Sequence, residues 1–545
     1  MIKVKKFIAT HRLVICLAIV HWFITTLFQL DRLFFQYEAE NKTMLVVKIV
    51  YFFALIAIYS YCAVGYEKYK INKNYFEGKI KIFLIHLSML LVLLLILWPG
   101  TWAWDDIWIL NNAQQYKLTP WQHIFSGFWH ILCLQFIPTP GGIIFIQLIV
   151  AAVCITYIVT KVQDMIFASF RYDTLEIRRV LFLLPFFLPP VLMYLYSGYR
   201  IGLYIFLEAT LLISLISLKY DKECTIQKLS IITVLTIVVS SWRTESFIYV
   251  LISSMAILMM KNNICKKEKA IAVVLLGIMF VGVTVAQEKM LHSDNYKIIS
   301  TLRPVAELVK VADKDIDRNE LIAIDKVINL STIYKNPGAN GESLYWAHHV
   351  VRNEYTRQDY KDYIKSAINL SYKYPLVVFH ERIRVLMASS SMNNIATNNT
   401  YGARTLFYKK KLGNMTDGSK QYFQRLQAPA SKPVFMKMRE KVIRLLGCMK
   451  SNFSLYPIYK LIWNHLLPTC FIIFFYIYQL FKKNYWVCSI LLGLILKWPI
   501  IFFTSPSDWF MYYLSFYLIG YMILIYSLLY IYLKFQHKGA ETHES

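Results

Sequence analysis

Two adjacent carboxylates, Asp105 and Asp106, follow closely on a long apolar segment that ends at Pro99-Gly100. The residues around them include three tryptophans, Trp102, Trp104 and Trp108. Tryptophan favours the headgroup level of a bilayer, because its ring prefers apolar surroundings while its N–H needs a polar partner. The pattern therefore predicts two acids at a membrane surface, where a carboxylate can take a proton from a substrate hydroxyl.

Helix geometry divides the roles of the two acids. Successive helical residues point about 100° apart, so only one of Asp105 and Asp106 can face a given cavity. The other would orient it, bind a metal or cap the helix. The plainer interpretation is an acidic pair in the first turn of a helix, which carboxylates stabilise by roughly 0.3–1 kcal/mol.

Further ionisable residues stand at or near the same side of other apolar segments in the topology given below. They are Arg200, Glu208, Arg243, Glu245, Lys497 and Asp508. Charges within a bilayer are costly and are usually paired or functional, so a one-sided set predicts a polar cavity. Arginine offers a planar fork of donors and lysine a point charge, which makes Arg200, Arg243 and Lys497 candidates for binding a phosphate.

Several of these residues also have a purely structural interpretation. Arg243 and Glu245 could form an internal pair at a hairpin tip, and Glu208 is expected to pair with a nearby cation. Lys497 could instead extend toward the headgroups. His123 is a supporting candidate beside the acids, although an interfacial histidine more often packs than acts as a base.

The composition excludes a soluble globular protein and predicts an all-α polytopic protein of the cell membrane. Of the 545 residues, 57% are hydrophobic and 17% charged, and a span needs about 20 apolar residues. The net charge of +26 lies largely in loops, where it orients the chain, so it predicts no nucleic-acid partner. Twelve spans with both termini in the cytoplasm are predicted, at about 13–30, 44–64, 82–98, 141–160, 180–196, 201–218, 229–242, 246–260, 270–287, 458–481, 485–503 and 509–534.

The spans predict three regions. Residues 1–287 form a transmembrane core with an outer acidic loop at 100–140, and residues 288–455 form a mainly helical extracytoplasmic domain. Residues 456–545 form the last helices and a cytoplasmic tail. The segment 404–450 is basic, but long loops cross a membrane largely regardless of charge.

No cofactor is firmly predicted. The nine cysteines are scattered singly without ligand-like spacing, so neither a disulfide framework nor a zinc site is expected. A divalent metal at the acidic pair stays open. The sequence also has no glycine-rich nucleotide loop of the form G-x-x-x-x-G-K-[ST].

The outer acids at Asp105-Asp106, the basic tips at Arg200 and Arg243, and the many-span layout together resemble the GT-C superfamily of membrane glycosyltransferases. The motif follows the third predicted span, as in poorly characterised Gram-positive relatives. The resemblance implies a polyprenyl-phosphate-linked sugar as donor and a cell-surface polymer or lipid-linked glycan, such as a cell-wall polysaccharide, as acceptor. It implies an inverting transfer in which Asp105 deprotonates the acceptor hydroxyl while Arg243, Arg200 and Lys497 hold the lipid phosphate.

Two other functions remain open at this point. A polysaccharide polymerase would share a many-span core and a large outer loop. A flippase or transporter of lipid-linked oligosaccharides is less favoured, because a transporter needs ionisable groups near the midplane that are reachable from both sides.

Overall fold

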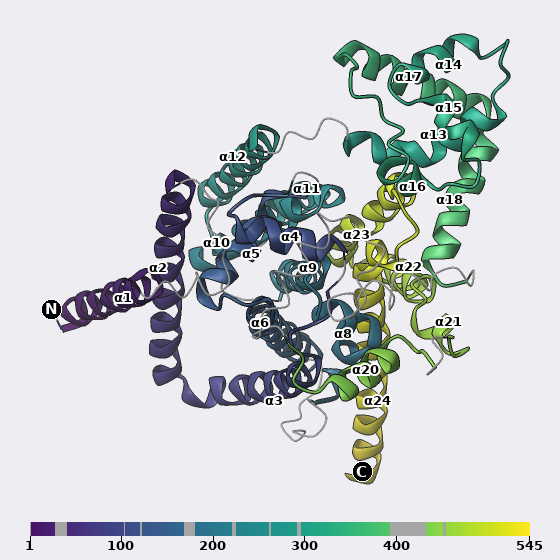
Figure 1. The fold of residues 1–545 in the computed structure, drawn as a ribbon. Helices are drawn as coiled ribbons and strands as arrows, with labels where there is room; N and C mark the ends of the chain where they lie inside the picture. The colour runs from purple at the N-terminus through teal and green to yellow at the C-terminus, as the bar shows by residue number, and fades with distance from the viewer. Residues whose placement is uncertain are drawn as a thin grey trace.

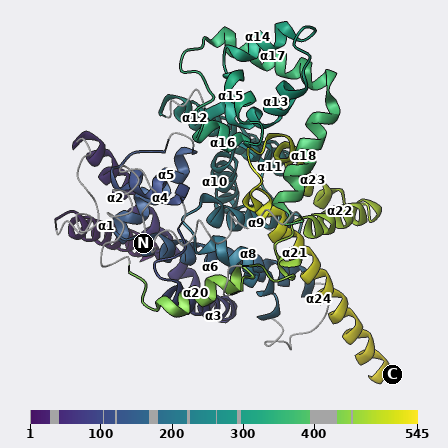
Figure 2. The same ribbon diagram turned by 45° about the vertical axis from the view of Figure 1, so that its right-hand side comes forward.

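The chain folds into helices throughout the residues that the computed structural model describes, which are 2–27, 41–102, 104–119, 122–167, 180–220, 225–260, 263–290, 296–392, 432–450 and 454–544. Within these ranges, extended pairing is limited to isolated bridges such as Thr101 with Ser197. Figures 1 and 2 show a bundle of long helices with a smaller group of short helices, α13 to α18, on one side of it. The all-α prediction is confirmed.

Eight helical segments within the described residues are long and apolar enough to cross a bilayer. They are α2 (Asn41–Ile71), α3 (Lys73–Leu97), α6 (Pro140–Phe167), α9 (Arg200–Ser217), α12 (Lys266–Met290), α21 with α22 (Tyr459–Ile462 and Leu466–Phe481), α23 (Tyr485–Thr504), and η8 with α24 (Phe510–Tyr513 and Leu514–Glu544). Shorter apolar stretches belong to α1 (Ile2–Leu27), α5 (Ile124–Phe136), α10 (Ile226–Trp242) and η3 with α11 (Thr244–Ser246 and Ile248–Met259). The chain is therefore a helical membrane protein by length and composition, and the count of twelve spans stays a prediction.

The segment 180–196, which we predicted as one span, is not a continuous helix. It contains a short 3₁₀ helix, η2 (Leu184–Phe187), followed by α8 (Pro189–Leu195). Pro185 lies in the first element, and Pro189 and Pro190 begin the second. Proline lacks the N–H that a continuing helix needs and restricts the residue before it, so three prolines within six residues break the span.

Close helix contacts hold the bundle together. A Cβ on Gly520 of α24 would lie 2.1 Å from the backbone oxygen of Pro468 in α22, so only glycine allows this approach. Elsewhere α6 packs between α3 and α9, and α10 packs against α9, α11 and α12. Large side chains such as Trp102, Tyr204 and Tyr249 are fully buried between these helices.

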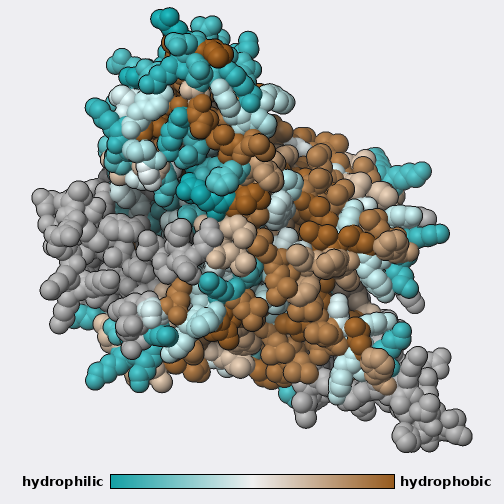
Figure 3. Space-filling view, turned by 90° about the vertical axis from the view of Figure 1, so that its right-hand side faces the viewer, coloured by the Kyte–Doolittle hydropathy of each residue, from teal (hydrophilic) through white to brown (hydrophobic). Residues whose placement is uncertain are grey.

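The outer face of the bundle is apolar, as expected for a surface in contact with lipid. Helix α22 exposes Ile473, Phe474, Ile477, Tyr478 and Phe481. Figure 3 shows hydrophobic side chains spread over the bundle below a largely hydrophilic cap, which is the group α13–α18. This division is typical of a protein whose bundle lies in a bilayer and whose smaller part lies in water.

The smaller part has a hydrophobic core of its own, and we call it the polar module. It consists of η4 (Tyr296–Ile298), α13 (Ile299–Val311), α14 (Arg318–Asp325), α15 (Leu330–Lys335), α16 (Gly341–Trp346), α17 (Arg357–Lys373) and most of α18 (Pro375–Ser389). Its core includes Leu302, Leu308, Ile324, Ile328 and Leu370. The module falls within the predicted domain 288–455, and its position outside the cytoplasm stays a prediction.

The last described part of that predicted domain packs on the bundle. Helix α20 (Met436–Leu446) packs against α3 and α8 of the bundle, and its Ile443 belongs to the bundle core. The buried Arg439 donates to the carbonyl oxygens of Leu97 and Gly100, at 3.3 and 2.8 Å. The basic stretch 404–431 lies outside the described residues.

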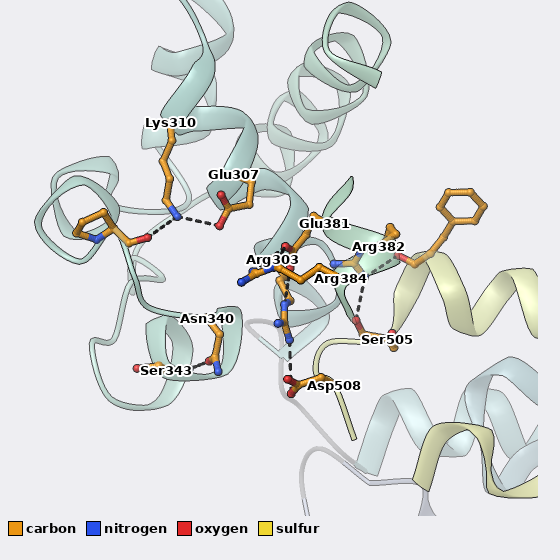
Figure 4. A network of polar contacts seen from close by, with 12 residues as sticks. Arg303, Glu307, Lys310, Asn340, Ser343, Glu381, Arg382, Arg384, Ser505 and Asp508 are labelled. Atoms are coloured by element: carbon orange, nitrogen blue, oxygen red, sulfur yellow. Dashed lines mark hydrogen bonds and ion pairs between the residues drawn. The ribbon is translucent and has the colours of Figure 1, made fainter. Parts of the chain in front are cut away.

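Polar contacts fix the module on the bundle (Figure 4). Within the module, Arg303 Nε donates to Glu381 Oε1 at 2.5 Å. The same side chain reaches the bundle, where Arg303 Nη1 lies 3.8 Å from Asp508 Oδ1 in the loop between α23 and α24. Arg382 Nη1 donates to the carbonyl oxygen of Ser505 in the same loop, at 2.9 Å. The module therefore has a defined position relative to the 505–508 loop.

Candidate functional site

The acidic pair begins helix α4 (Trp104–Gln114), directly after the turn that ends α3. Gly100 has a φ of 101°, which favours glycine, and the Thr101 N–H donates to the carbonyl oxygen of Tyr196 at 2.7 Å. These contacts fix where α4 starts. Asp106 is fully buried, whereas Asp105 is half-buried. The two acids thus diverge as helix geometry requires, and Asp105 is the one that solvent or a substrate can reach.

Asp105 lies within electrostatic range of Arg200, the first residue of α9. Burial raises the pKa of the Asp105 carboxyl, and the positive charge of Arg200 opposes that shift. A carboxylate with a raised pKa is a better base at neutral pH than an ordinary aspartate. Two segments nearly a hundred residues apart are therefore brought together as an acid and a cation.

A second arginine lies close to the first. Arg243 caps the end of α10 and forms an ion pair with Glu245 of η3. Its guanidinium carbon lies 5.9 Å from the ring centre of Tyr204 and 5.6 Å from that of Tyr512. Arg243 also acts electrostatically on Arg200. The internal pair considered for the 243–245 tip is present, and both of its charges act electrostatically on Arg200.

Lys497 occupies a deeper position. Its Nζ donates to Glu208 Oε1 at 2.7 Å and to the Tyr204 hydroxyl at 2.9 Å, and the two charged side chains are 1% and 0% exposed. The Tyr249 hydroxyl donates to the same Glu208 oxygen at 2.5 Å. Glu208 thus pairs with a cation as expected, and Lys497 is already bound on two sides. Its hydrogen bond to Tyr204 links it to Arg243, whose guanidinium carbon lies 5.9 Å from the centre of the same ring.

Tyr204 lies between the deep Lys497–Glu208 ion pair and Arg243. Its hydroxyl contacts the Lys497 ammonium below and lies 2.5 Å from Ser246 Oγ, while its ring faces Arg243. Tyr204 therefore connects the Lys497–Glu208 ion pair to the Arg243–Glu245 ion pair. Arg243 is almost completely buried, whereas Arg200 and Glu245 keep partial exposure.

His123 is the N-cap residue of α5 and accepts a weak hydrogen bond of 3.4 Å from the Phe125 N–H. Burial, reinforced by the charge of Arg200, lowers the pKa of His123 to about 4. The imidazole is therefore neutral near pH 7. It lies close to the site, as a neutral polar neighbour of Arg200.

The polar module adds residues that the sequence analysis did not select. Burial raises the pKa of Glu342 to about 7; a hydrogen bond with Ser507 and the charge of Arg303 oppose the shift, while the charges of Asp508 and Asp105 reinforce it. Burial raises the pKa of Tyr296 to about 12, opposed by Arg200 and reinforced by Asp105, Glu342 and Tyr345. Glu342 and Tyr296 thus both lie within electrostatic range of Asp105, and Tyr296 also lies within range of Arg200.

Their sequence context carries no signal for this role. Glu342 follows Asn340-Gly341 in a polar stretch, where a carboxylate is unremarkable, and Tyr296 is one of 39 tyrosines. Asp508 was noticed because it interrupts an apolar region. A charged residue is conspicuous in a sequence only when its neighbours are apolar, and the residues next to Glu342 are polar.

Two surface hollows lie elsewhere. One, of about 630 Å³, is on the module and is lined by Lys314, Arg318, Lys326, Arg352, Asp325 and three apolar side chains. The other, of about 310 Å³, is lined by residues such as Ser391, Tyr456 and Lys460. Neither includes the residues predicted for the site. Among the described residues, no group of three or more His, Cys, Asp or Glu side chains is arranged to hold a metal ion.

Comparison with known proteins gives no relative: no family model, no curated protein and no solved structure matches this chain.

Proposed function

We propose that the protein is a membrane glycosyltransferase of the GT-C type, which moves a sugar from a polyprenyl-phosphate donor to a glycan acceptor on the outer face of the cell membrane. The observation that carries the proposal is a half-buried carboxylate, Asp105, within electrostatic range of Arg200, which is itself within electrostatic range of Arg243. A half-buried base next to two arginines matches what a sugar phosphate and an acceptor hydroxyl require.

Asp105 acts as the base in this proposal. Its carboxylate takes the proton from an acceptor hydroxyl while the hydroxyl oxygen attacks the anomeric carbon of the donor. The bond between that carbon and the phosphate oxygen breaks, and its electron pair leaves with the lipid phosphate. Attack from the opposite side inverts the anomeric configuration. A positioned base contributes about 10²–10⁴-fold to the rate.

Arg200 and Arg243 hold the departing phosphate. The leaving group gains negative charge in the transition state, and fixed guanidinium groups stabilise it most where water is largely excluded. Arg243 is already oriented by Glu245 and by two tyrosine rings. Lys497 supports the site from below through Tyr204 instead of binding the phosphate.

The topology that goes with this function puts the polar module and Asp105 outside and both termini in the cytoplasm. Reporter fusions at the module and at the termini test it. An enzyme reporter active only in the periplasm or outside the cell should report from the module, and one active only in the cytoplasm should report from the termini. The opposite result would exclude an extracellular donor site.

Reconstituted protein provides the test of activity. Proteoliposomes are supplied with a radiolabelled polyprenyl-phosphate hexose and a cell-envelope fraction as acceptor, and label transfer is measured. We expect Asp105→Asn to lower transfer at least 100-fold while the protein stays folded in the membrane. The exposed Glu354 of the module supplies the matched control, Glu354→Gln, which should leave transfer unchanged. Undiminished transfer by the Asp105 variant would refute the assignment.

The arginines are tested by lipid binding. Arg200→Gln and Arg243→Gln should weaken binding of polyprenyl phosphate at least tenfold, because each removes a charge-assisted donor. The matched control is Arg318→Gln, which neutralises an exposed arginine of the module and should bind the lipid like the wild type. Equal binding by all three glutamine variants and the wild type would overturn the phosphate site.

A further inference from the structure

An aromatic cluster stands on the module next to the proposed site. The ring centres of Tyr296 and Tyr345 are 6.2 Å apart, and those of Tyr345 and Trp346 are 4.8 Å apart at nearly a right angle. Tyr296 and Trp346 are separated by 6.5 Å. Trp346 is 50% exposed and the two tyrosines are half-buried. Trp346 is thus the most exposed ring of this cluster.

Helix α16 places a carboxylate beside these rings. Glu342 precedes Tyr345 by three residues and Trp346 by four, and residues at these spacings share one face of a helix. The start of α16 is fixed: Asn340 accepts a hydrogen bond from the Ser343 N–H at 2.8 Å, and a Cβ on Gly341 would lie 3.1 Å from Arg303 Cβ. The carboxylate and the rings therefore form one rigid unit.

This unit lies within electrostatic range of the proposed catalytic base. Asp105 acts electrostatically on both Glu342 and Tyr296, and Arg200 acts on Tyr296. The charged and titratable groups that face Glu342 are Asp105 from α4, Arg303 from α13, Asp508 from the 505–508 loop, Tyr512 from η8 and Tyr296 from η4. Together with Glu342 itself, this group contains three carboxylates, since Asp105 and Asp508 are the other two.

An aromatic ring beside a carboxylate suits a neutral sugar. The apolar face of a sugar ring packs on an aromatic face, and its hydroxyls donate to a carboxylate. Among the charges that act on Glu342, the carboxylates Asp105 and Asp508 outnumber the one arginine, Arg303, so this part of the site disfavours a phosphate or a sugar acid. The two halves of the site thus favour different ligand charges.

We propose that Glu342, Tyr296 and Trp346 form the acceptor subsite and bind a neutral sugar of the acceptor glycan, with one hydroxyl directed at Asp105. This inference rests on the proposed function. Trp346 supplies the exposed ring, Glu342 accepts hydroxyl hydrogen bonds, and Tyr296 lies between them and Arg200. The module therefore selects the acceptor while the bundle holds the donor.

The test is direct glycan binding by the full-length protein in lipid nanodiscs. The probe is an array of neutral oligosaccharides and of phosphate-bearing oligosaccharides, read without donor. We expect the wild type to bind neutral members of the array. Trp346→Ala and Glu342→Gln should each weaken that binding at least tenfold. Polyprenyl-phosphate binding is measured on the same samples and should be unaffected by the two module variants.

Matched controls separate the subsite from the rest of the module. Tyr372→Ala removes an aromatic side chain that is 82% exposed on α17, and Glu354→Gln neutralises an exposed carboxylate. Both should bind glycans like the wild type. Trp346 is half exposed and glutamine has the shape of glutamate, so the test variants are expected to fold, and their elution in size-exclusion chromatography checks this.

The inference is overturned if the wild type binds none of the neutral glycans, if only phosphate-bearing glycans bind, or if the two module variants bind as tightly as the wild type. These outcomes leave polyprenyl-phosphate binding by Arg200 and Arg243 untouched. Failure of the proposed function instead shows as absence of lipid-phosphate binding and of sugar transfer in the wild type. The two failures are therefore distinguishable.

Discussion

Replacing Lys497 by methionine separates a structural role from a substrate-binding role at the deep ion pair. The Lys497 ammonium and the Glu208 carboxylate are 2.7 Å apart and almost fully buried. At an effective dielectric constant of about 20, that 2.7 Å separation gives an attraction of about 6 kcal/mol. Desolvation of the two ions offsets much of this, so the pair itself adds little net stability.

Breaking the pair is a different matter. Lys497→Met leaves Glu208 charged and buried, which costs about 3–5 kcal/mol. The second variant, Lys497→Met with Glu208→Gln, removes both charges of the pair, and the glutamine amide oxygen can still accept from the Tyr249 hydroxyl. We expect this double variant to recover most of the loss and to unfold within about 2 kcal/mol of the wild type.

The assay is equilibrium unfolding by SDS titration in mixed micelles, followed by binding of polyprenyl phosphate to the folded protein. Exposed Lys482→Met is the control and should change stability by less than about 0.5 kcal/mol. If Lys497 is structural, the double variant binds the lipid phosphate like the wild type. A stable double variant that no longer binds the lipid would refute our reasoning and return Lys497 to the phosphate site, as the sequence first suggested.

Three further outcomes are expected. Because the raised pKa of Glu342 is about 7, its carboxylate becomes protonated as the pH falls below that value, so the acceptor KM should rise toward pH 5.5 in the wild type and stay flat in Glu342→Gln; identical profiles would contradict this. Gly520→Ala brings a Cβ to 2.1 Å from the Pro468 oxygen and should cost about 1–3 kcal/mol by overpacking, measured as thermal stability in detergent against Gly282→Ala, which meets nothing within 4 Å. Thr356 forms a capping box at the start of α17, so Thr356→Ala should destabilise the module by about 1 kcal/mol, seen as faster hydrogen exchange of α17 in the full-length protein; unchanged exchange would show that the cap does not hold this helix.

Part of the candidate site could be predicted from the sequence, namely the charged residues that adjoin apolar segments. Asp105, Arg200 and Arg243 could be selected because each is a charge at the edge of an apolar segment, where a charge is expensive. The sequence could not tell that Asp106 is buried while Asp105 is reachable, since that depends on how α4 lies on its neighbours. Nor could it show that Lys497 and Glu208, 289 positions apart, satisfy each other.

The fold was anticipated in class but not in every element. Hydropathy identifies long apolar helices because each must span about 30 Å of hydrocarbon. It reads the broken segment at Leu184–Leu195 as one span, since the leucines and phenylalanines there are apolar whether or not the backbone is continuous. The prolines were the missed signal, and they are visible in the sequence.

The polar module explains why a survey of charges in the predicted spans could select residues from only one part of the proposed site. Arg303 contacts Glu381 within the module and Asp508 in the bundle, and Gly341 packs directly on Arg303. The same arginine thus ties the docking of the module to the start of α16 and so to the position of Glu342. If acceptor binding requires Glu342 near Asp105, then Arg303→Met should impair glycan binding without touching the donor arginines. A site assembled in this way is complete only when the module is docked, because neither part alone contains both the base and the proposed acceptor contacts.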